Sequence, residues 1–407
     1  MNSKKRMLFF FGVVTLFSMV CSFAHPVTPS LFKQLHLADY MFGVALAVMQ
    51  LGNMLFSPFW AKISKRSSNR RTLLISSLGY GAGQLLFSQS KTVLQVILIR
   101  FLTGIFVGGI FVSMLAYVVN VSENESERKK NLILMATLEG VFNAIGYFIG
   151  GMLGEIGVIF SVVVQAICLA VCAVLFYLVC VEDRQILPEG GGGNRIDRAF
   201  IRECNPFSVL VNGRILLKGM LGLMLGIAAL QYFGQTCFDQ SFNYYVIDQI
   251  GLSTGYNGAI KGVMGLVTLL ANSTICVWLM KKTKLTRSLV YLLFICGVVI
   301  SASLAVNALA PYLVLNILFY ASSCISVPMI QDLTTTWGKK HTGDSNLVVG
   351  YYNAMKNLGG ILGALLAGFT YIVTPKTPFL CCAASFFLAA AMAMICDRKG
   401  RRSSAAD

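Results

Sequence analysis

The sequence predicts an all-α integral membrane protein with twelve transmembrane helices, arranged as two six-helix pseudo-repeats around a central cavity. Hydrophobic residues make up 56% of the 407 residues and charged residues only 12%. The mean hydropathy of +0.71 is far above what a water-soluble domain of this size needs. Apolar runs long enough to cross a bilayer, which takes about 20 residues, recur along the whole chain. The two halves of the chain also match each other.

The apolar runs of the first half predict six spans. They lie near 7–30, 41–60, 72–89, 94–118, 131–153 and 157–180. The first run follows Lys4, Lys5 and Arg6 and resembles a secretory signal peptide. Its removal would leave eleven spans and break the match between the halves, so we interpret it as a retained helix.

The second half predicts six further spans after a long polar stretch. They lie near 215–240, 256–280, 288–308, 311–334, 347–372 and 378–396. The polar stretch contains Pro188 and the glycine run 190–193, which is typical of a flexible linker. We therefore predict three parts, namely an N-terminal six-helix half at 1–181, a cytoplasmic linker at 182–214 and a C-terminal six-helix half at 215–407.

A sequence repeat relates the two halves. Residues 140–145 read GVFNAI and residues 350–355 read GYYNAM, an offset of 210, and 37–51 agrees with 252–266 at five positions at an offset of 215. Parallel repeats of membrane-spanning halves are typical of secondary transporters, which hold their substrate between the halves. The repeat predicts that Gly150 and Gly360 occupy equivalent places.

Basic residues concentrate on one side of the predicted membrane. The N-terminus, the linker, the C-terminus and alternate loops hold 26 of the 33 lysines and arginines, whereas the opposite loops hold only Lys33, Lys91 and Lys376. By the positive-inside rule, both termini and the linker are cytoplasmic in a multi-pass protein of the plasma membrane. The net charge of +16 therefore reflects topology and contact with membrane lipid, and we expect no nucleic-acid binding.

Charged residues inside the predicted spans indicate where the substrate and proton pathway lies. A charge at the bilayer centre costs at least about 2.5–3.5 kcal/mol, so such residues face protein or water and mark function. Asn143 shares a helix face with Glu139, and the repeat pairs Asn143 with Asn353. Asp239 falls at the end of the seventh span, where we expect it to be in water. The predicted substrate and proton pathway comprises Arg100, Glu139, Asn143, Lys261, Asn353 and Lys356.

Each embedded charge shares its helix face with glycines three, four or seven residues away. Small residues let helices pack closely in lipid, so we expect these faces to point towards protein. The glycines predicted to pack helices are Gly104, Gly108, Gly146, Gly150, Gly151, Gly359, Gly360 and Gly363. Three embedded cations against one carboxylate favour an anionic or zwitterionic solute.

Three stretches resemble motifs of the major facilitator superfamily, and within it of the drug:proton antiporter branch. Arg100-Phe-Leu-Thr-Gly104 resembles the fourth-helix motif with its embedded arginine, residues 146–151 (GYFIGG) resemble the fifth-helix antiporter motif, and 61–71 resembles the loop joining helices two and three. Tyr147 replaces the usual proline of the antiporter motif. The resemblance implies that helices 3, 6, 9 and 12 are peripheral, and these predicted spans contain no Asp, Glu, Lys or Arg.

The sequence therefore predicts a secondary active transporter that moves a small organic solute across the cytoplasmic membrane by alternating access. Proton-coupled efflux is the favoured mode, with Glu139 carrying the proton and Lys356 meeting the solute. The alternative is proton-coupled uptake of an organic anion. A remote alternative is an integral-membrane enzyme, which would be expected to show a cluster of His, Asp or Ser at one membrane face. No such cluster is visible in the sequence.

The predicted partners follow from the same observations. They are a small-molecule solute, protons and membrane lipid. The twelve cysteines are scattered and the three histidines have no ligand partners at metal spacing. We therefore expect no metal and no cofactor, and a monomer.

Overall fold

The computed structural model describes residues 3–183, 219–342 and 345–404, and all regular structure in these ranges is helical. Apart from Glu182 and Asp183, the predicted linker 182–214 lies outside the described residues. Contacts between Cα atoms divide the chain into two compact units. Unit 1 comprises 1–37, 48–206 and 252–262, and unit 2 comprises 38–47, 207–251 and 263–407. Two short segments thus differ from the predicted halves 1–181 and 215–407, which remain a prediction.

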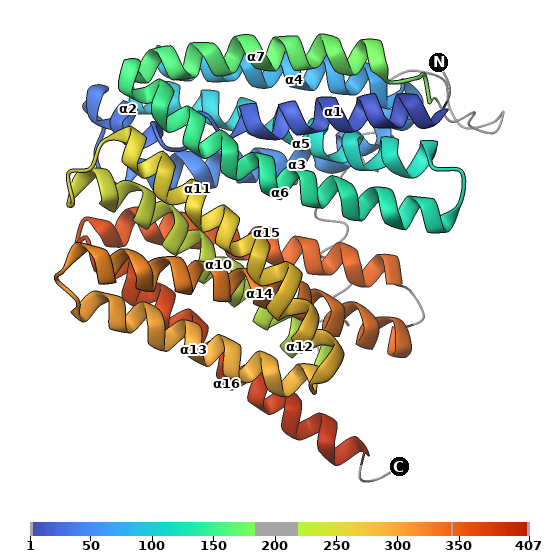
Figure 1. The fold of residues 1–407 in the computed structure, drawn as a ribbon, viewed down its shortest axis with the longest axis vertical. Coiled ribbons are helices and arrows are strands. Elements are labelled where there is room, and N and C mark those ends of the chain that lie inside the picture. Colours follow the sequence, from blue (N-terminus) through green and yellow to red (C-terminus); the bar gives the residue numbers. More distant parts are fainter. Residues whose placement is uncertain (1–2, 184–218, 343–344, 405–407) are drawn as a thin grey trace. The chain divides into compact units, whose positions relative to one another are not determined.

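The first half of the chain forms helices at all six predicted spans (Figure 1). They are α1 (Ser3–Cys21), α2 (Thr28–Gln34), α3 (Met41–Arg66), α4 (Asn69–Ser88), α5 (Val93–Val121), α6 (Glu125–Ile156) and α7 (Val158–Val179). Polar residues fix several starts. The Ser68 and Asn124 side chains accept backbone N–H groups at the starts of α4 and α6, and Thr92 forms a capping box with Gln95 at α5.

The first predicted span, 7–30, is wrong in one respect, because it is not one continuous helix. It ends as α1 at Cys21, and a turn leads to the short helix α2. Pro26 and Pro29 explain the break, since proline disfavours helix in the residue before it, while Pro29 is tolerated in the first turn of α2. The break leaves the last carbonyl groups of α1 without a full set of helical partners.

The second half also forms helices at all six predicted spans. They are α10 (Gly219–Asp248), α11 (Thr254–Ala271) continued by a π-helical turn η2 (Asn272–Cys276) and α12 (Val277–Lys282), then α13 (Leu285–Ala305), α14 (Leu309–Thr342), α15 (Ser345–Tyr371) and α16 (Thr377–Ser404). The predicted all-α fold with twelve spans is confirmed.

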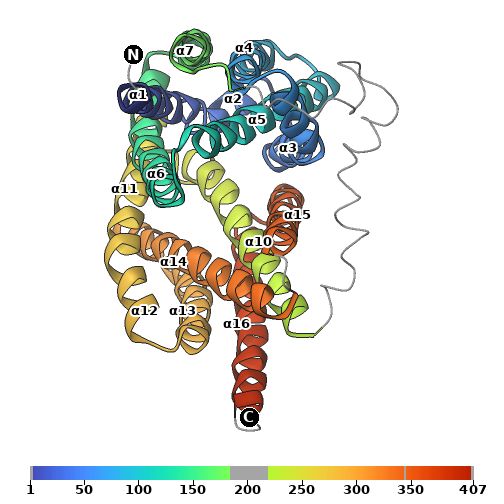
Figure 2. The ribbon, with the colours of Figure 1, turned by 90° about the vertical axis from the view of Figure 1, so that its right-hand side faces the viewer.

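Each unit has its own aromatic core. In unit 1, Phe10 of α1 packs against Tyr117 of α5 and Phe176 of α7, with ring centroids 4.7 and 6.0 Å apart. In unit 2, Phe319 of α14 packs 4.5 Å from Phe238 of α10 and 5.3 Å from Phe386 of α16. Figure 2 shows α7 and α15 nearly end-on and α16 along its length.

The two halves repeat one helix-packing contact. A Cβ added at Gly146 or Gly150 of α6 would collide with the carbonyl oxygens of Met19 and Phe23 at the end of α1. A Cβ added at Gly359 or Gly363 of α15 would collide in the same way with Ala229 and Phe233 of α10. The glycine pairs and the carbonyl pairs are each four residues apart, so the contact is equivalent. Gly363, and not the predicted Gly360, is therefore the counterpart of Gly150.

The helices that the sequence predicts to be peripheral carry exposed apolar stripes. On α7 the exposed residues Ile167, Val171, Val174 and Leu178 follow one another at helical spacing, and α4, α13 and α16 have similar stripes. Large contiguous apolar surfaces are rare on soluble monomers. Nine helices in the described part of the chain are long and apolar enough to cross a membrane, and the protein is a multi-pass membrane protein.

Candidate functional site

Arg100 lies inside unit 1, where only 7% of its surface is exposed. Its Nη1 is 3.4 Å from Gln84 Oε1 and 3.7 Å from the Met49 sulfur, and its guanidinium carbon lies 3.5 Å from the centroid of the Phe87 ring. Nε has no hydrogen-bond partner, and no carboxylate among the described residues forms an ion pair with Arg100. The positive charge is thus held by an amide, a sulfur and a π face.

A chain of polar groups continues from Arg100 to the break after α1. Gln84 Nε2 donates to the Tyr80 hydroxyl (3.3 Å), which in turn donates to the Cys21 carbonyl (3.4 Å). Gln165 Nε2 donates to the carbonyl groups of Cys21 (2.9 Å) and Val20 (3.1 Å). Side chains of α4 and α7 therefore donate hydrogen bonds to the last carbonyl groups of α1, which lack donors within the helix.

Asn143 and Glu139 lie one turn apart on α6, beside the same break. The Ser22 hydroxyl donates to Asn143 Oδ1 at 2.9 Å, and the Cys21 thiol approaches the same oxygen at 3.5 Å. Glu139 is half-buried and forms neither a hydrogen bond nor an ion pair with any described residue. In particular, no ion pair joins it to Arg100. A carboxyl group near the middle of a membrane helix without a fixed partner is available for proton exchange.

Lys356 lies in unit 2, eleven residues after the start of α15, or about 17 Å along the helix. That depth is near the middle of a hydrocarbon core about 30 Å thick. Lys356 is partly buried, and its Nζ lies 4.9 Å from the centroid of the Tyr232 ring. It forms no ion pair with a described residue. Lys356 is therefore a cation held by an aromatic face, with donors left for a solute.

Polar residues of α10 form a stripe in unit 2. Gln231, Gln235 and Asp239 are four residues apart and share one helix face. Gln231 Nε2 donates to Gln235 Oε1 (2.7 Å) and to the Ser323 carbonyl (3.3 Å) of α14.

The expectation that Asp239 lies at a helix end is wrong. α10 continues for nine residues beyond it, to Asp248, and buried aromatic residues such as Phe242 and Tyr244 pack this less apolar segment. Asp239 is therefore, like Glu139, a carboxylate well inside a helix.

The remaining pathway predictions have different outcomes. Lys261 is buried, with 4% of its surface exposed, in the 252–262 segment of unit 1. One turn before it, Asn257 donates to the Pro26 carbonyl at 3.1 Å. Asn353 is exposed, unlike its repeat counterpart Asn143. The structure therefore brings Asn143 and Glu139 together at the break after α1, and it leaves Asn353 outside any polar cluster of the described residues.

The other motif glycines also allow close helix contacts. A Cβ at Gly104 would collide with the Met49 carbonyl of α3, and Gly108 lies against the same helix one turn further on. Gly151 meets Gly258 of α11 within unit 1. The packing role predicted for these glycines is consistent with their surroundings, because each faces another backbone or a polar side chain.

Five residues of the polar cluster in unit 1 were not predicted, namely Cys21, Ser22, Tyr80, Gln84 and Gln165. Two signals in the sequence indicate them. The prolines after α1 indicate the break, and glutamines inside otherwise apolar spans indicate buried polar contacts. Within the described residues, no group of three or more His, Cys, Asp or Glu could hold a metal ion.

Membrane-spanning helices in a twofold repeat, with buried charges held by amides and aromatic rings, define a multi-pass membrane transporter. Residues 10–363 match the family model of the Major Facilitator Superfamily. The chain belongs to this family, and is therefore a transporter of small molecules rather than an enzyme.

Comparisons with individual proteins agree with the branch that the motifs resemble. The chain is 22% identical over 359 residues to Multidrug resistance protein 1 of Bacillus subtilis (strain 168), covering 87% of this chain and 86% of the relative. It is 31% identical over 148 residues to Tetracycline resistance protein, class B, of Escherichia coli, covering 35% and 36%. The crystal structure of the nucleoside transporter NupG superposes with a TM-score of 0.71 at 12% identity, covering 97% and 98%, which shows the fold alone. The predicted resemblance to the drug:proton antiporter branch is confirmed.

Proposed function

We propose that the protein exports a small organic solute from the cytoplasm in exchange for protons. The names of the multidrug and tetracycline resistance relatives support export. The observation that carries the coupling is Glu139, a half-buried carboxyl group inside a membrane helix with no ion pair to any described cation. Proton binding at Glu139 breaks no ion pair, so the group is suited to pick up and release a proton in each cycle.

Glu139 is placed where a proton-linked change could be transmitted. Asn143, one turn away, is hydrogen-bonded to Ser22 at the break after α1. Broken membrane helices expose backbone groups that bind ions and substrates in other transporters. In this proposal, the charge state of Glu139 alters the Asn143–Ser22 contact and hence the arrangement of α1 against α6.

Lys356 supplies the solute contact in this proposal. Its ammonium group is oriented by the Tyr232 ring and has no carboxylate partner among the described residues. A solute carboxylate or enolate would satisfy those donors in a site of low dielectric. Asp239 is within the helices of the same unit and favours a solute that also carries a positive group, so a zwitterion fits the charges best.

Arg100 has a positioning role. Through Gln84 and Tyr80 it is connected to the carbonyl group at the end of α1, and its guanidinium plane is stacked on Phe87 of α4. Its charge therefore supports the geometry around the break without neutralising Glu139.

Proton-coupled uptake of an organic anion is the second candidate. It is supported by the two embedded cations, Arg100 and Lys356, which have no carboxylate partners among the described residues. For both functions we propose a monomer in the plasma membrane. The distribution of lysine and arginine supports cytoplasmic termini.

One experiment separates the two directions. The purified protein is reconstituted in proteoliposomes of known orientation, with tetracycline, benzoate or tetraphenylphosphonium as a zwitterionic, anionic or cationic probe. Export in exchange for protons moves a probe towards the side of higher proton concentration, whereas symport moves it down the proton gradient. We expect the first result, with tetracycline as the preferred probe. Benzoate uptake along the proton gradient would favour the second candidate.

A further inference from the structure

Unit 2 contains a cavity of about 180 Å³ at one end of its helices. It lies where α10 and α13 end and where α14 and α16 begin, and none of the six predicted pathway residues lines it. A water molecule needs about 10–15 Å³ on this measure. The cavity therefore has room for a group of many atoms, at a place separate from the proposed transport pathway.

Aromatic rings form much of the wall of this cavity. The Tyr245 ring of α10 lies 5.6 Å from Phe379 of α16 and 5.9 Å from Tyr312 of α14, measured between centroids. Leu304 and other aliphatic side chains complete the wall. Such a lining covers a flat or aliphatic ligand body with little loss of side-chain entropy.

Lys376 is the charged residue in the wall of this cavity. It is exposed, and its Nζ donates one hydrogen bond, to the Leu304 carbonyl at 3.3 Å. It forms no ion pair with a described residue, and no acidic residue lines the cavity. Two N–H donors of the ammonium group are therefore left for an anionic group.

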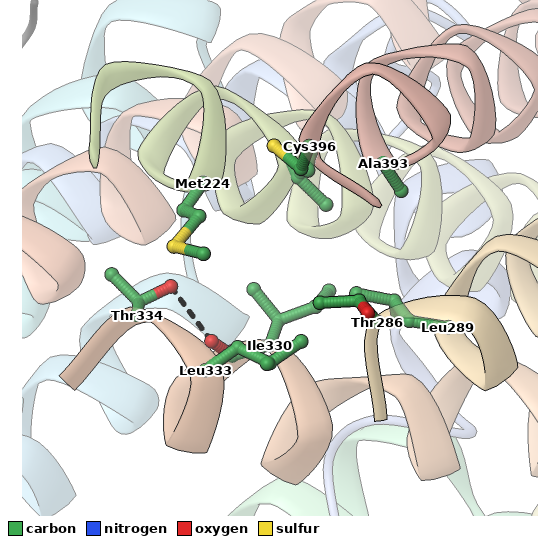
Figure 3. Close-up of a pocket in the computed structure, with 9 residues that line it drawn as sticks. Met224, Thr286, Leu289, Ile330, Leu333, Thr334, Ala393 and Cys396 are labelled. Carbon is green, nitrogen blue, oxygen red and sulfur yellow. Dashed lines mark hydrogen bonds between the residues drawn. The ribbon is translucent and has the colours of Figure 1, made fainter. Parts of the chain in front are cut away.

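A second cavity in unit 2 provides a contrast (Figure 3). It measures about 10 Å³, at the limit for a single water molecule, and its lining is mainly apolar, with Met224 and Ile330 among the side chains. The Thr334 hydroxyl is satisfied by the Ile330 carbonyl at 2.7 Å. This second cavity has neither the room of the larger one nor a charged residue in its wall.

We propose that the larger cavity binds an anionic amphiphile, namely a phosphate or carboxylate group on an apolar body. The Lys376 ammonium contacts the anionic oxygens, and the rings of Tyr245 and Phe379 cover the adjoining apolar part. Lys376 is located between helix ends, at the level of lipid headgroups. A phospholipid with an anionic headgroup is one source of this chemistry, and a soluble aromatic carboxylate is the other.

Binding to the full-length protein in detergent tests this site. Dioleoylphosphatidylglycerol, dioleoylphosphatidylcholine and benzoate are titrated separately, and binding is measured by native mass spectrometry and thermal shift. Lys376→Ala should weaken phosphatidylglycerol binding about tenfold or more, through loss of a charge-assisted contact. Lys91→Ala, which removes another exposed lysine of the same predicted side, should leave binding unchanged. Lys376→Arg keeps the charge and should retain most of it.

The outcomes distinguish the two sources. Phosphatidylglycerol binding that depends on Lys376, without benzoate binding, supports a lipid site. Benzoate binding with the same dependence supports a site for soluble carboxylates. If neither phosphatidylglycerol nor benzoate binds, the proposal is overturned. Equal binding by wild type and Lys376→Ala, or equal losses in Lys376→Ala and Lys91→Ala, also overturns it.

Discussion

Arg100 and Lys356 show how single residues keep a charge inside a membrane protein without an ion pair. The Arg100 guanidinium is stacked on Phe87, and the Lys356 ammonium faces Tyr232. A planar guanidinium suits a fixed stack, whereas an ammonium on a flexible stem keeps rotatable donors for another partner. We therefore propose different roles for the two cations, with Arg100 held by its protein partners and Lys356 keeping donors for a solute.

Lys356→Ala tests the solute contact at this scale. Because the variant removes the only positive charge that we assign to solute binding, we expect affinity for tetracycline to fall about tenfold and affinity for a neutral analogue to change little. Equilibrium binding to the purified protein measures both affinities, with Lys91→Ala as the control for loss of a lysine. Unchanged tetracycline affinity in Lys356→Ala would remove the argument for an anionic solute group.

Arg100→Lys tests whether the contacts of the Arg100 guanidinium with Phe87 and Gln84 stabilise the protein. The substitution keeps the charge but loses the planar stack on Phe87 and the reach to Gln84, so we expect about 1–3 kcal/mol of lost stability. Thermal unfolding followed by tryptophan fluorescence measures it. A variant as stable as the wild type would show that charge alone suffices at this position.

At the scale of helices, the apolar runs predicted every span, because bilayer thickness dictates length and hydropathy. They did not predict the break after Cys21, since counting apolar residues ignores what Pro26 does to the backbone. The apolar runs also predicted an end of the seventh span before Asp248. Local hydropathy does not show that tertiary packing buries Tyr244 and its neighbours. The charges of the site were found from sequence, whereas Gln84 and Gln165 were missed because tertiary packing chooses the partners of neutral polar residues.

The equivalent close contacts at Gly150 and Gly363 can be tested by substitution. Gly150→Leu and Gly363→Leu each place a side chain against the backbone of a packed helix, so we expect each to cost about 1–3 kcal/mol or more. Gly12→Leu is the matched control, since a Cβ at Gly12 meets nothing within 4 Å. Thermal unfolding of the three variants provides the measurement. Wild-type stability in both packed variants would contradict the equivalence of the two contacts.

At the scale of the whole molecule, we propose that charge outside the predicted membrane spans sets orientation and that charge inside them serves function. The loops of one predicted side hold only three of the 33 lysines and arginines. This uneven distribution of lysine and arginine explains the net charge of +16 without nucleic-acid binding. It is also the basis of the proposed topology.

Single-cysteine labelling tests this topology. In a background with all twelve native cysteines replaced, an impermeant thiol reagent applied to whole cells should label a cysteine at position 33 or 91. It should spare one at position 194 until the membrane is opened. The reverse pattern would invert the orientation and place both termini outside.

The central claim is that Glu139 carries the coupling proton, and one paired measurement tests it most directly. Proteoliposomes containing wild type or Glu139→Gln are assayed for tetracycline flux driven by an imposed pH gradient, and then for exchange of labelled against unlabelled tetracycline without a gradient. Glutamine keeps the shape of the side chain but cannot cycle a proton. We expect Glu139→Gln to lose gradient-driven flux and to retain most of the exchange. Gradient-driven flux in Glu139→Gln equal to that of the wild type would contradict the proposed role of Glu139.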